Sequence, residues 1–131
     1  MKNTGIWLDK KKAIIVTLEN DAESMNTITS GLEDFRATSN KTEGGPLEIA
    51  KDLKYLERRK HQYRSYFKEI AAKIKDSDAL VIFGPAQTNE KFNKELSENF
   101  KALSAKVKAV KKTDSMTDNQ IKAWVRDFYN L

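Results

Sequence analysis

Apolar residues recur at strand spacing within the first 30 residues. Residues 5–9 and 13–18 are short runs rich in apolar and β-branched side chains, and the polar turn 10–12 separates them. Residues 25–30 alternate more weakly, with Ile28 on the face opposite Met25, and predict a third strand at or near a sheet edge. We therefore expect an antiparallel meander of three strands.

A long helix is predicted behind the polar, aperiodic stretch 32–46. Its apolar stripe has alternating spacings of four and three residues, and it consists of Ile49, Leu53, Leu56, Lys60, Tyr63, Phe67, Ile70 and Ile74. Only Lys60 interrupts this stripe. Because the stripe is thin and the charge densest in the first turns, we expect the N-terminal half of the helix to project and the C-terminal half to pack on the sheet.

Strands and helices alternate in the remainder of the chain. Residues 79–83 read as a buried strand, and 84–87 as a turn that leads into a helix capped by Thr88. Residues 105–111 form another strand, in which Val110 breaks the alternation, and a last helix follows. Thr117 and Gln120 have the spacing of a capping box at its start.

This order predicts the fold class. The sequence β-β-β-α-β-α-β-α indicates an α/β domain of the ribonuclease-H-like type, with a mixed five-stranded sheet between helices in three layers. The 131 residues fit a single domain, 1–131. The absence of cysteine excludes disulfides and thiolate sites, and the single histidine disfavours a His-based metal site. No apolar run reaches the length of a membrane span and no signal peptide is recognisable, so we expect a cytoplasmic protein.

Positive charge is concentrated on the predicted long helix. The chain carries a net +5, and the segment from residue 51 to residue 68 alone contains seven basic residues against two acidic ones. The basic residues are Lys51, Lys54, Arg58, Arg59, Lys60, Arg64 and Lys68. Such a stripe suits a polyanion, although a solvated helix face has the same composition.

Aromatic residues are interleaved with these charges. Tyr55, His61, Tyr63 and Tyr66 would stack on nucleic-acid bases if they were exposed. Core packing is the simpler interpretation of Tyr63 and Tyr66, and His61 is most simply a surface residue.

Catalytic constellations are weak. A two-metal nuclease needs converging carboxylates, and Asp9, Glu19 and Asp78 stand at predicted strand ends. No further acid lies inside a predicted strand or directly after Phe83, at the end of the strand 79–83. These three acids are therefore more simply interpreted as solvated turn residues. The stretch 84–88 matches no phosphate-binding glycine motif. We expect no catalytic residue, no metal and no cofactor.

Three segments carry a resemblance to a known family. GIWLDKKKAIIV (5–16), ALVIFGPAQTNEKF (79–92) and KTDSMTDNQIKAWVRDFY (112–129) resemble the small bacterial relatives of the middle domain of archaeal and eukaryotic release factors and of Pelota. The unit from residue 44 to residue 96 resembles the same middle domain. The resemblance covers nearly the whole chain. It implies a translation factor domain in which an exposed loop precedes a long basic helix.

The same resemblance implies a role for the loop. In release factors that loop carries Gly-Gly-Gln and promotes hydrolysis of peptidyl-tRNA; here Gly44 and Gly45 occupy the corresponding place and Pro46 follows. Proline lacks an N–H and has a fixed φ, so the departure falls on the residue most tied to catalysis. The turn before the last helix also lacks the histidine often found in the small relatives.

Three functions follow as hypotheses. The first is a noncatalytic, translation-associated module that binds ribosomal RNA or tRNA, with Lys51, Lys54, Arg58, Arg59, Arg64 and Lys68 on phosphates and with Gly44 and Gly45 as the approaching tip. The second is a hydrolase, acting on peptidyl-tRNA or as a metal-dependent nuclease. The third is a protein-interaction or homo-oligomerisation domain that uses the long helix.

Overall fold

Five strands form one mixed sheet in the order β3-β2-β1-β4-β5. The computed structural model describes residues 1–30, 46–85 and 87–130, with the side chains of 46–59 outside that description. β1, β2 and β3 form the predicted antiparallel meander, while β4 and β5 run parallel to β1. The strands are β1 (Lys2–Leu8), β2 (Lys12–Glu19), β3 (Ala22–Thr29), β4 (Ala79–Gly84) and β5 (Val107–Lys112).

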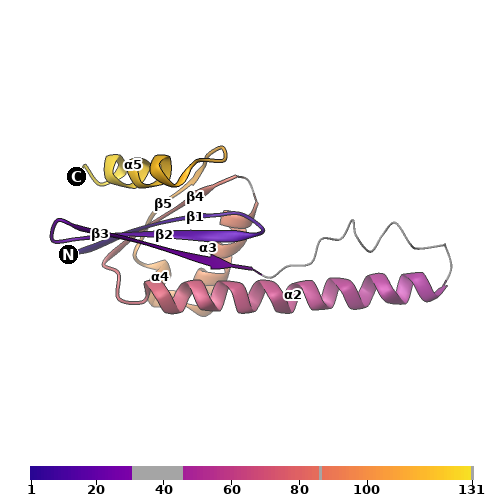
Figure 1. Cartoon of the computed structure of the whole chain (residues 1–131). Helices are drawn as coiled ribbons and strands as arrows, with labels where there is room; N and C mark the ends of the chain where they lie inside the picture. The colour runs from indigo at the N-terminus through magenta and orange to yellow at the C-terminus, as the bar shows by residue number, and fades with distance from the viewer. Residues whose placement is uncertain (31–45, 86, 131) are drawn as a thin grey trace.

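Helices cover both faces of the sheet (Figure 1). One face carries α2 (Pro46–Ile74), α3 (Thr88–Asn99) and the short α4 (Lys101–Ser104), and the other carries α5 (Asp118–Phe128). This is the predicted three-layer α/β architecture of the ribonuclease-H-like type, with α4 as an unpredicted addition. Of the described helices, none is both long and apolar enough to cross a membrane.

Alternating side chains of the strands build two hydrophobic clusters. Ile6 and Ile82 face α2 and α3, whereas Trp7 and Phe83 face α5. All four side chains are buried. Because full burial of one such side chain contributes about 1.5–3 kcal/mol, the alternation fixes which face of each strand meets which helix layer.

A bulge in β5 explains the break in its alternation. Leu80 pairs with Val107, but its neighbour Val81 pairs with Ala109, so Lys108 is the extra residue. Val107 and Val110 therefore both pack against the cluster under α2 and α3. A β-bulge reverses the side-chain alternation locally, which the sequence shows only as an irregularity.

The turn between β4 and α3 is built around Gly84. Its φ is +139°, and a Cβ there would lie 2.5 Å from the carbonyl oxygen of Leu8. Gln87, with a φ of 48°, is the residue that caps α3, and its side chain makes no capping hydrogen bond. The prediction that Thr88 caps this helix is therefore wrong by one residue, since Thr88 is already helical and buried.

α2 extends beyond the sheet, as Figure 1 shows. Its C-terminal half packs on the sheet through buried side chains such as Phe67, Ile70 and Ile74. Its N-terminal half continues past the edge where β1 and β4 end. The predicted division of this helix into a projecting half and a packed half is confirmed.

Candidate nucleic-acid interface

Tyr66 marks the point at which α2 leaves the sheet. Its hydroxyl donates a hydrogen bond of 3.1 Å to the carbonyl oxygen of Asp9, in the turn between β1 and β2. Only 2% of the residue is exposed, and burial raises the pKa of its phenol well above the usual value. Tyr66 is therefore a core residue, and it cannot stack on a nucleic-acid base.

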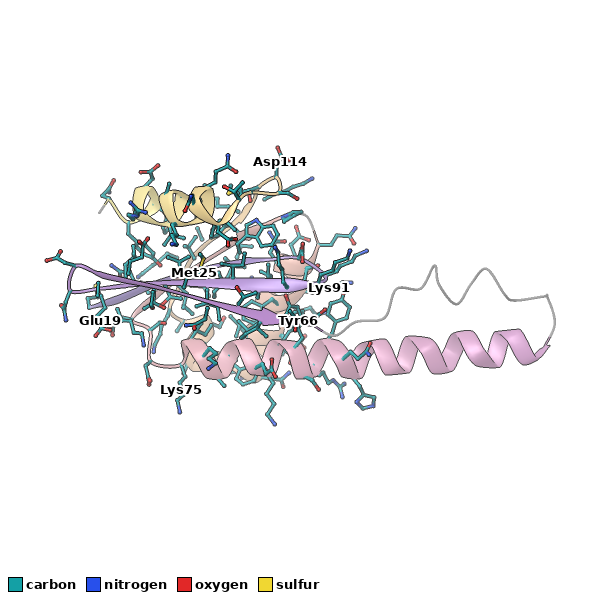
Figure 2. All side chains as sticks on the ribbon, in the orientation of Figure 1. Glu19, Met25, Tyr66, Lys75, Lys91 and Asp114 are labelled. Atoms are coloured by element: carbon teal, nitrogen blue, oxygen red, sulfur yellow. The ribbon has the colours of Figure 1, made fainter. Side chains whose placement is uncertain are left out.

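Tyr63 lies one turn closer to the projecting half. Its ring is half-buried and lies 5.5 Å from that of Phe67, measured between centroids. The ammonium of Lys91, on α3, lies 5.1 Å from the centre of the same ring. This geometry is a cation–π contact. It places one basic residue of α3 beside α2 at the sheet edge, as the positions of Lys91 and Tyr66 in Figure 2 show.

The turn between β1 and β2 presents three lysines at this same edge. The Asp9 carboxylate accepts hydrogen bonds from the backbone N–H groups of Lys11 and Lys12, at 2.8 and 2.9 Å. The hydroxyl of Ser30 donates to the carbonyl oxygen of Lys10 at 2.6 Å. These bonds fix the turn, while the side chains of Lys10, Lys11 and Lys12 are exposed.

A groove separates this turn from the start of α3. It has a volume of about 470 Å³, and it is lined by Asp9, Lys10, Lys11, Pro85, Gln87 and Thr88. The buried side chain of Asn89 supports its far wall, because its amide nitrogen lies 3.3 Å from the carbonyl oxygen of Gly84 and 3.1 Å from that of Lys111. The ends of β4 and β5 are thereby tied together. The sequence offered no signal for this role of Asn89.

Exposed basic residues cover this edge of the sheet and one face of α2. On α2, Lys60, Arg64 and Lys68 are exposed, and their spacing of four places them on one face. At the end of the sheet where β1, β4 and β5 terminate, the exposed basic residues are Lys10, Lys11, Lys12, Lys91, Lys111 and Lys112. We call this group the basic edge. In the described part of the chain, none of these side chains takes part in an ion pair.

The other predicted contact residues fall outside what the structure describes. Lys51, Lys54, Arg58 and Arg59 belong to the projecting half of α2, but their side chains lie outside the described part. The same holds for Tyr55. Gly44 and Gly45 lie outside the described residues altogether. His61 is exposed, as the sequence indicated.

The basic edge was missed by sequence reasoning. Residues 10–12 were interpreted only as a polar turn, and Lys91, Lys111 and Lys112 were assigned no functional role. The signal was the topology: β1, β4 and β5 are parallel, so their C-terminal ends meet at one edge. The N-terminal half of α2 passes that same edge.

The carboxylates weighed for a nuclease do not converge. Asp9 follows the end of β1 and Asp78 precedes the start of β4, and these strands are parallel. With about 3.3 Å per strand residue, the two acids lie roughly 20 Å apart, at opposite ends of the sheet. The Asp78 carboxylate accepts a hydrogen bond of 2.7 Å from the backbone N–H of Lys2, so its role is structural.

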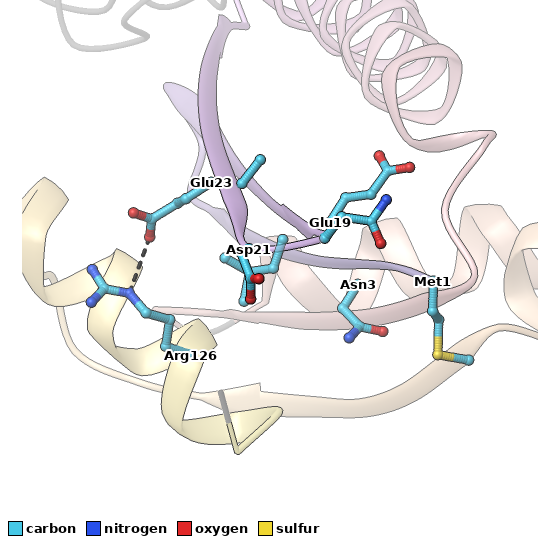
Figure 3. Close-up of a pocket in the computed structure, with 9 residues that line it drawn as sticks. Met1, Asn3, Glu19, Asp21, Glu23 and Arg126 are labelled. Atoms are coloured by element: carbon cyan, nitrogen blue, oxygen red, sulfur yellow. Dashed lines mark hydrogen bonds and ion pairs between the residues drawn. The ribbon is translucent and has the colours of Figure 1, made fainter.

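Glu19 lies at the end of the sheet away from Asp9. With Asp21 and Glu23 it lines a pocket of about 580 Å³ (Figure 3), where Glu23 pairs with Arg126 at 3.1 Å. Among the described residues, no group of three potential ligands is placed to hold a metal ion. A metal-dependent nuclease built on Asp9, Glu19 and Asp78 is therefore incompatible with the fold.

Segments of known proteins of solved structure have a similar fold. No protein-family model matches the chain, and no curated protein does. Pelota from Archaeoglobus fulgidus matches with a TM-score of 0.61 and 14% identity, over 96% of this chain and 31% of Pelota. Pelota from Thermoplasma acidophilum gives 0.58 and 16%, over 95% and 32%.

An archaeal translation termination factor, aRF1, matches equally well. Its TM-score is 0.61 at 9% identity, over 99% of this chain and 35% of aRF1. The chain thus spans about one third of the length of each of these proteins. At such low identity the likeness concerns the fold, and this chain has the fold shared by a segment of Pelota and aRF1.

Proposed function

We propose that the protein is a noncatalytic, translation-associated module that binds ribosomal RNA or tRNA, acting as one domain. Its contact surface combines the basic face of α2 with the basic edge, and Gly44 and Gly45 form the approaching tip. On α2 the phosphate contacts are Lys51, Lys54, Arg58, Arg59, Arg64 and Lys68. The fold that the chain shares with Pelota and with a translation termination factor supports this proposal.

The observation that carries the proposal is the convergence of cations from separate elements, none of which forms an ion pair with another described residue. Lys10 and Lys11 come from the β1–β2 turn, Lys91 from α3 and Lys111 from the end of β5, at the edge where α2 departs. A solvated helix face would explain charge on α2 alone. It does not explain cations gathered from three further segments.

Phosphate binding has a measurable signature. Each neutralised phosphate releases counterions, so the logarithm of the binding constant falls with the logarithm of salt concentration, by about 0.7 per contact for a single strand. We therefore expect binding to purified ribosomes or to tRNA that weakens steeply across a salt series. A surface of this kind binds many RNA sequences, because phosphate contacts carry no sequence information.

The test compares two charge-reversal variants with a matched control. Arg58→Glu/Arg59→Glu alters the projecting half of α2, and Lys60→Glu/Arg64→Glu alters two exposed residues of its described part. Lys101→Glu/Lys122→Glu makes the same change of net charge on α4 and on α5, which covers the face of the sheet opposite α2. Loss of binding in the first two variants and retention in the third supports the proposal; equal loss in all three contradicts it.

The tip is tested separately. Gly44→Ala/Gly45→Ala removes the freedom of two adjacent glycines without a change of charge. If this variant binds ribosomes and tRNA like the unaltered protein, the tip has no binding role. Release of the peptide from peptidyl-tRNA by the unaltered protein would refute the noncatalytic assignment, and a salt-insensitive dimer in light scattering would favour oligomerisation through α2.

A further inference from the structure

A second groove lies on the packed half of α2, away from the basic edge. It runs between the C-terminal turns of α2 and the α3–α4 junction, and its volume is about 360 Å³. On one side it is lined by Lys68, Ala71 and Ala72 of α2 and by Lys75, which directly follows the helix, and on the other side by Phe100, Ala102, Leu103 and Lys106. Figure 2 shows Lys75 near the C-terminal end of α2, on the other side of the sheet region from Lys91.

The floor of this groove is apolar and built largely from small residues. Ala71 and Leu103 are buried, Phe100 is half-buried, and Ala72 and Ala102 are exposed to solvent. Lys68, Ala71 and Ala72 occur at spacings of three and four, so they share one face of α2, and Lys75 continues this spacing directly after the helix. Exposed alanines on both walls leave room for a side chain of another molecule to enter between the helices.

The rim of the groove is basic. Lys68, Lys75 and Lys106 line it, and within the described residues none of the three forms an ion pair. The ammonium of Lys106 lies 3.4 Å from the backbone carbonyl oxygen of Lys75, which directs it across the C-terminal end of α2. Glu69 and Asp76, the nearest acids in the α2 sequence, do not line the groove.

We infer that this groove binds an acidic amphipathic segment of a partner protein. Large aliphatic side chains of that segment fill the apolar floor, and its carboxylates meet the three lysines. An amphipathic helix laid in a groove is a recurrent mode of peptide recognition. Apolar anchors supply most of the affinity in such contacts, and complementary charge at the rim selects the partner.

An apolar floor with a basic rim favours this partner over RNA. Surfaces that bind single-stranded nucleic acid pair cations with aromatic rings on which bases stack, and the one aromatic residue that lines this groove, Phe100, is half-buried at its base. The groove also faces the packed half of α2, whereas the proposed RNA surface follows its projecting half. Lys68 belongs to both surfaces, so the test leaves it unchanged.

The experiment selects random 12-residue peptides displayed on phage against the purified full-length protein. Each round includes counter-selection on Ala72→Trp/Ala102→Trp, which fills the groove with two indole rings. Both positions are exposed, so this variant is expected to fold, and circular dichroism checks that it does. Enriched peptides are then synthesised with a fluorescent label, and their affinity is measured by fluorescence anisotropy.

We expect the selected peptides to combine Leu, Ile or Phe with Asp or Glu. Their affinity should fall at least tenfold for Lys75→Glu/Lys106→Glu, and they should lose binding when either their acidic or their aliphatic residues are replaced. Three outcomes would each overturn the inference. The selected peptides could be rich in Lys or Arg, they could bind the unaltered protein and Ala72→Trp/Ala102→Trp equally well, or no peptide could depend on the groove. The Lys75→Glu/Lys106→Glu variant should still bind tRNA. The inference about the groove is therefore tested independently of the proposed RNA-binding function.

Discussion

The phenol of Tyr66 donates a hydrogen bond to the backbone carbonyl oxygen of Asp9, 3.1 Å away and 57 residues earlier in the chain. This bond joins α2 to the β1–β2 turn at the edge where the helix leaves the sheet. The stacked ring of Phe67, with its centroid 5.7 Å from that of Tyr66, packs beside it. The bond therefore sets the position of the basic face of α2 relative to Lys10 and Lys11.

Replacement of Tyr66 with Phe should destabilise the protein modestly. The ring still packs on Phe67, but the carbonyl oxygen of Asp9 loses its donor, and a hydrogen bond of this kind contributes about 1 kcal/mol. Urea unfolding should show this loss in the free energy of unfolding. Tyr63→Phe is the positional control, since it removes a phenol hydroxyl from the neighbouring turn of α2; a larger effect in the control would contradict this assignment.

Stability should decrease at alkaline pH. Burial and the neighbouring negative charge of Asp9 raise the pKa of Tyr66, and burial raises the pKa of Tyr129. Above pH of about 10 the unfolded chain releases these protons while the folded protein retains them. The free energy of unfolding therefore falls as pH rises, by up to about 1.4 kcal/mol per pH unit for each tyrosine.

Tyr66→Phe serves as the control for this pH dependence. The variant lacks one of the two titrating groups, so its free energy of unfolding should fall less steeply between pH 10 and pH 11. Both proteins would be unfolded with urea at a series of pH values. Parallel curves for the two proteins would show that Tyr66 titrates alike in the folded and unfolded chain.

Asp9 should behave as a turn residue. Asp9→Ala removes the acceptor for the N–H groups of Lys11 and Lys12 and should cost about 1–2 kcal/mol of stability. Asp9→Asn keeps an oxygen that can accept these bonds and should cost less. Thermal unfolding would measure both variants. A rise in the melting temperature with Mg²⁺ that is lost in Asp9→Asn would instead indicate a metal role.

Gly5 should not tolerate a side chain. It lies in β1 directly beneath α5, and a Cβ at this position would overlap the side chain of Val125. Overpacking of this kind costs about 1–3 kcal/mol. Gly5→Ala should therefore lower the free energy of unfolding, and Val125→Ala in the same chain should recover part of the loss. Additive effects of the two substitutions would argue against direct contact.

The basic edge should contribute to RNA binding independently of α2. Lys10→Glu/Lys11→Glu should weaken tRNA binding and reduce the slope of its salt dependence by about 1–2, because one or two phosphate contacts are lost. Lys101→Glu/Lys122→Glu again controls for net charge. If the slope is unchanged in the first variant, the contact surface is confined to α2.

Local pattern predicted most of the fold. The strands were recognisable as short apolar or alternating runs and the long helices by apolar spacings of three and four residues. The Thr117–Gln120 capping box is formed, with mutual side-chain-to-backbone hydrogen bonds of 2.9 and 3.2 Å. The start of β1 escaped the pattern because Thr4 is polar. It is buried because its hydroxyl meets that of Ser77, 2.6 Å away and 73 residues later, and no local period reports such a pair.

The sequence predicted the candidate site less completely than it predicted the fold. Charge density identified the basic face of α2, since all its members lie on one helix. The basic edge draws Lys10, Lys91 and Lys111 from three segments that meet only through the parallel pairing of β1, β4 and β5. The break at Phe100, whose φ is −135°, makes α4 a helix separate from α3, and the spacing of the apolar residues does not show this break. The side of the second groove that α4 lines was therefore not predicted from the sequence.

The division of α2 into packed and projecting halves has a mechanical consequence. The side chains that hold the helix on the sheet begin near Tyr63, and residues 46–62 extend beyond them. At 1.5 Å per residue this segment is a lever arm of about 25 Å, so a tilt of about 10° at the anchor would sweep its far end through roughly 4 Å. Small rearrangements where Tyr66 meets Asp9 would thus be amplified at Pro46, next to the two glycines.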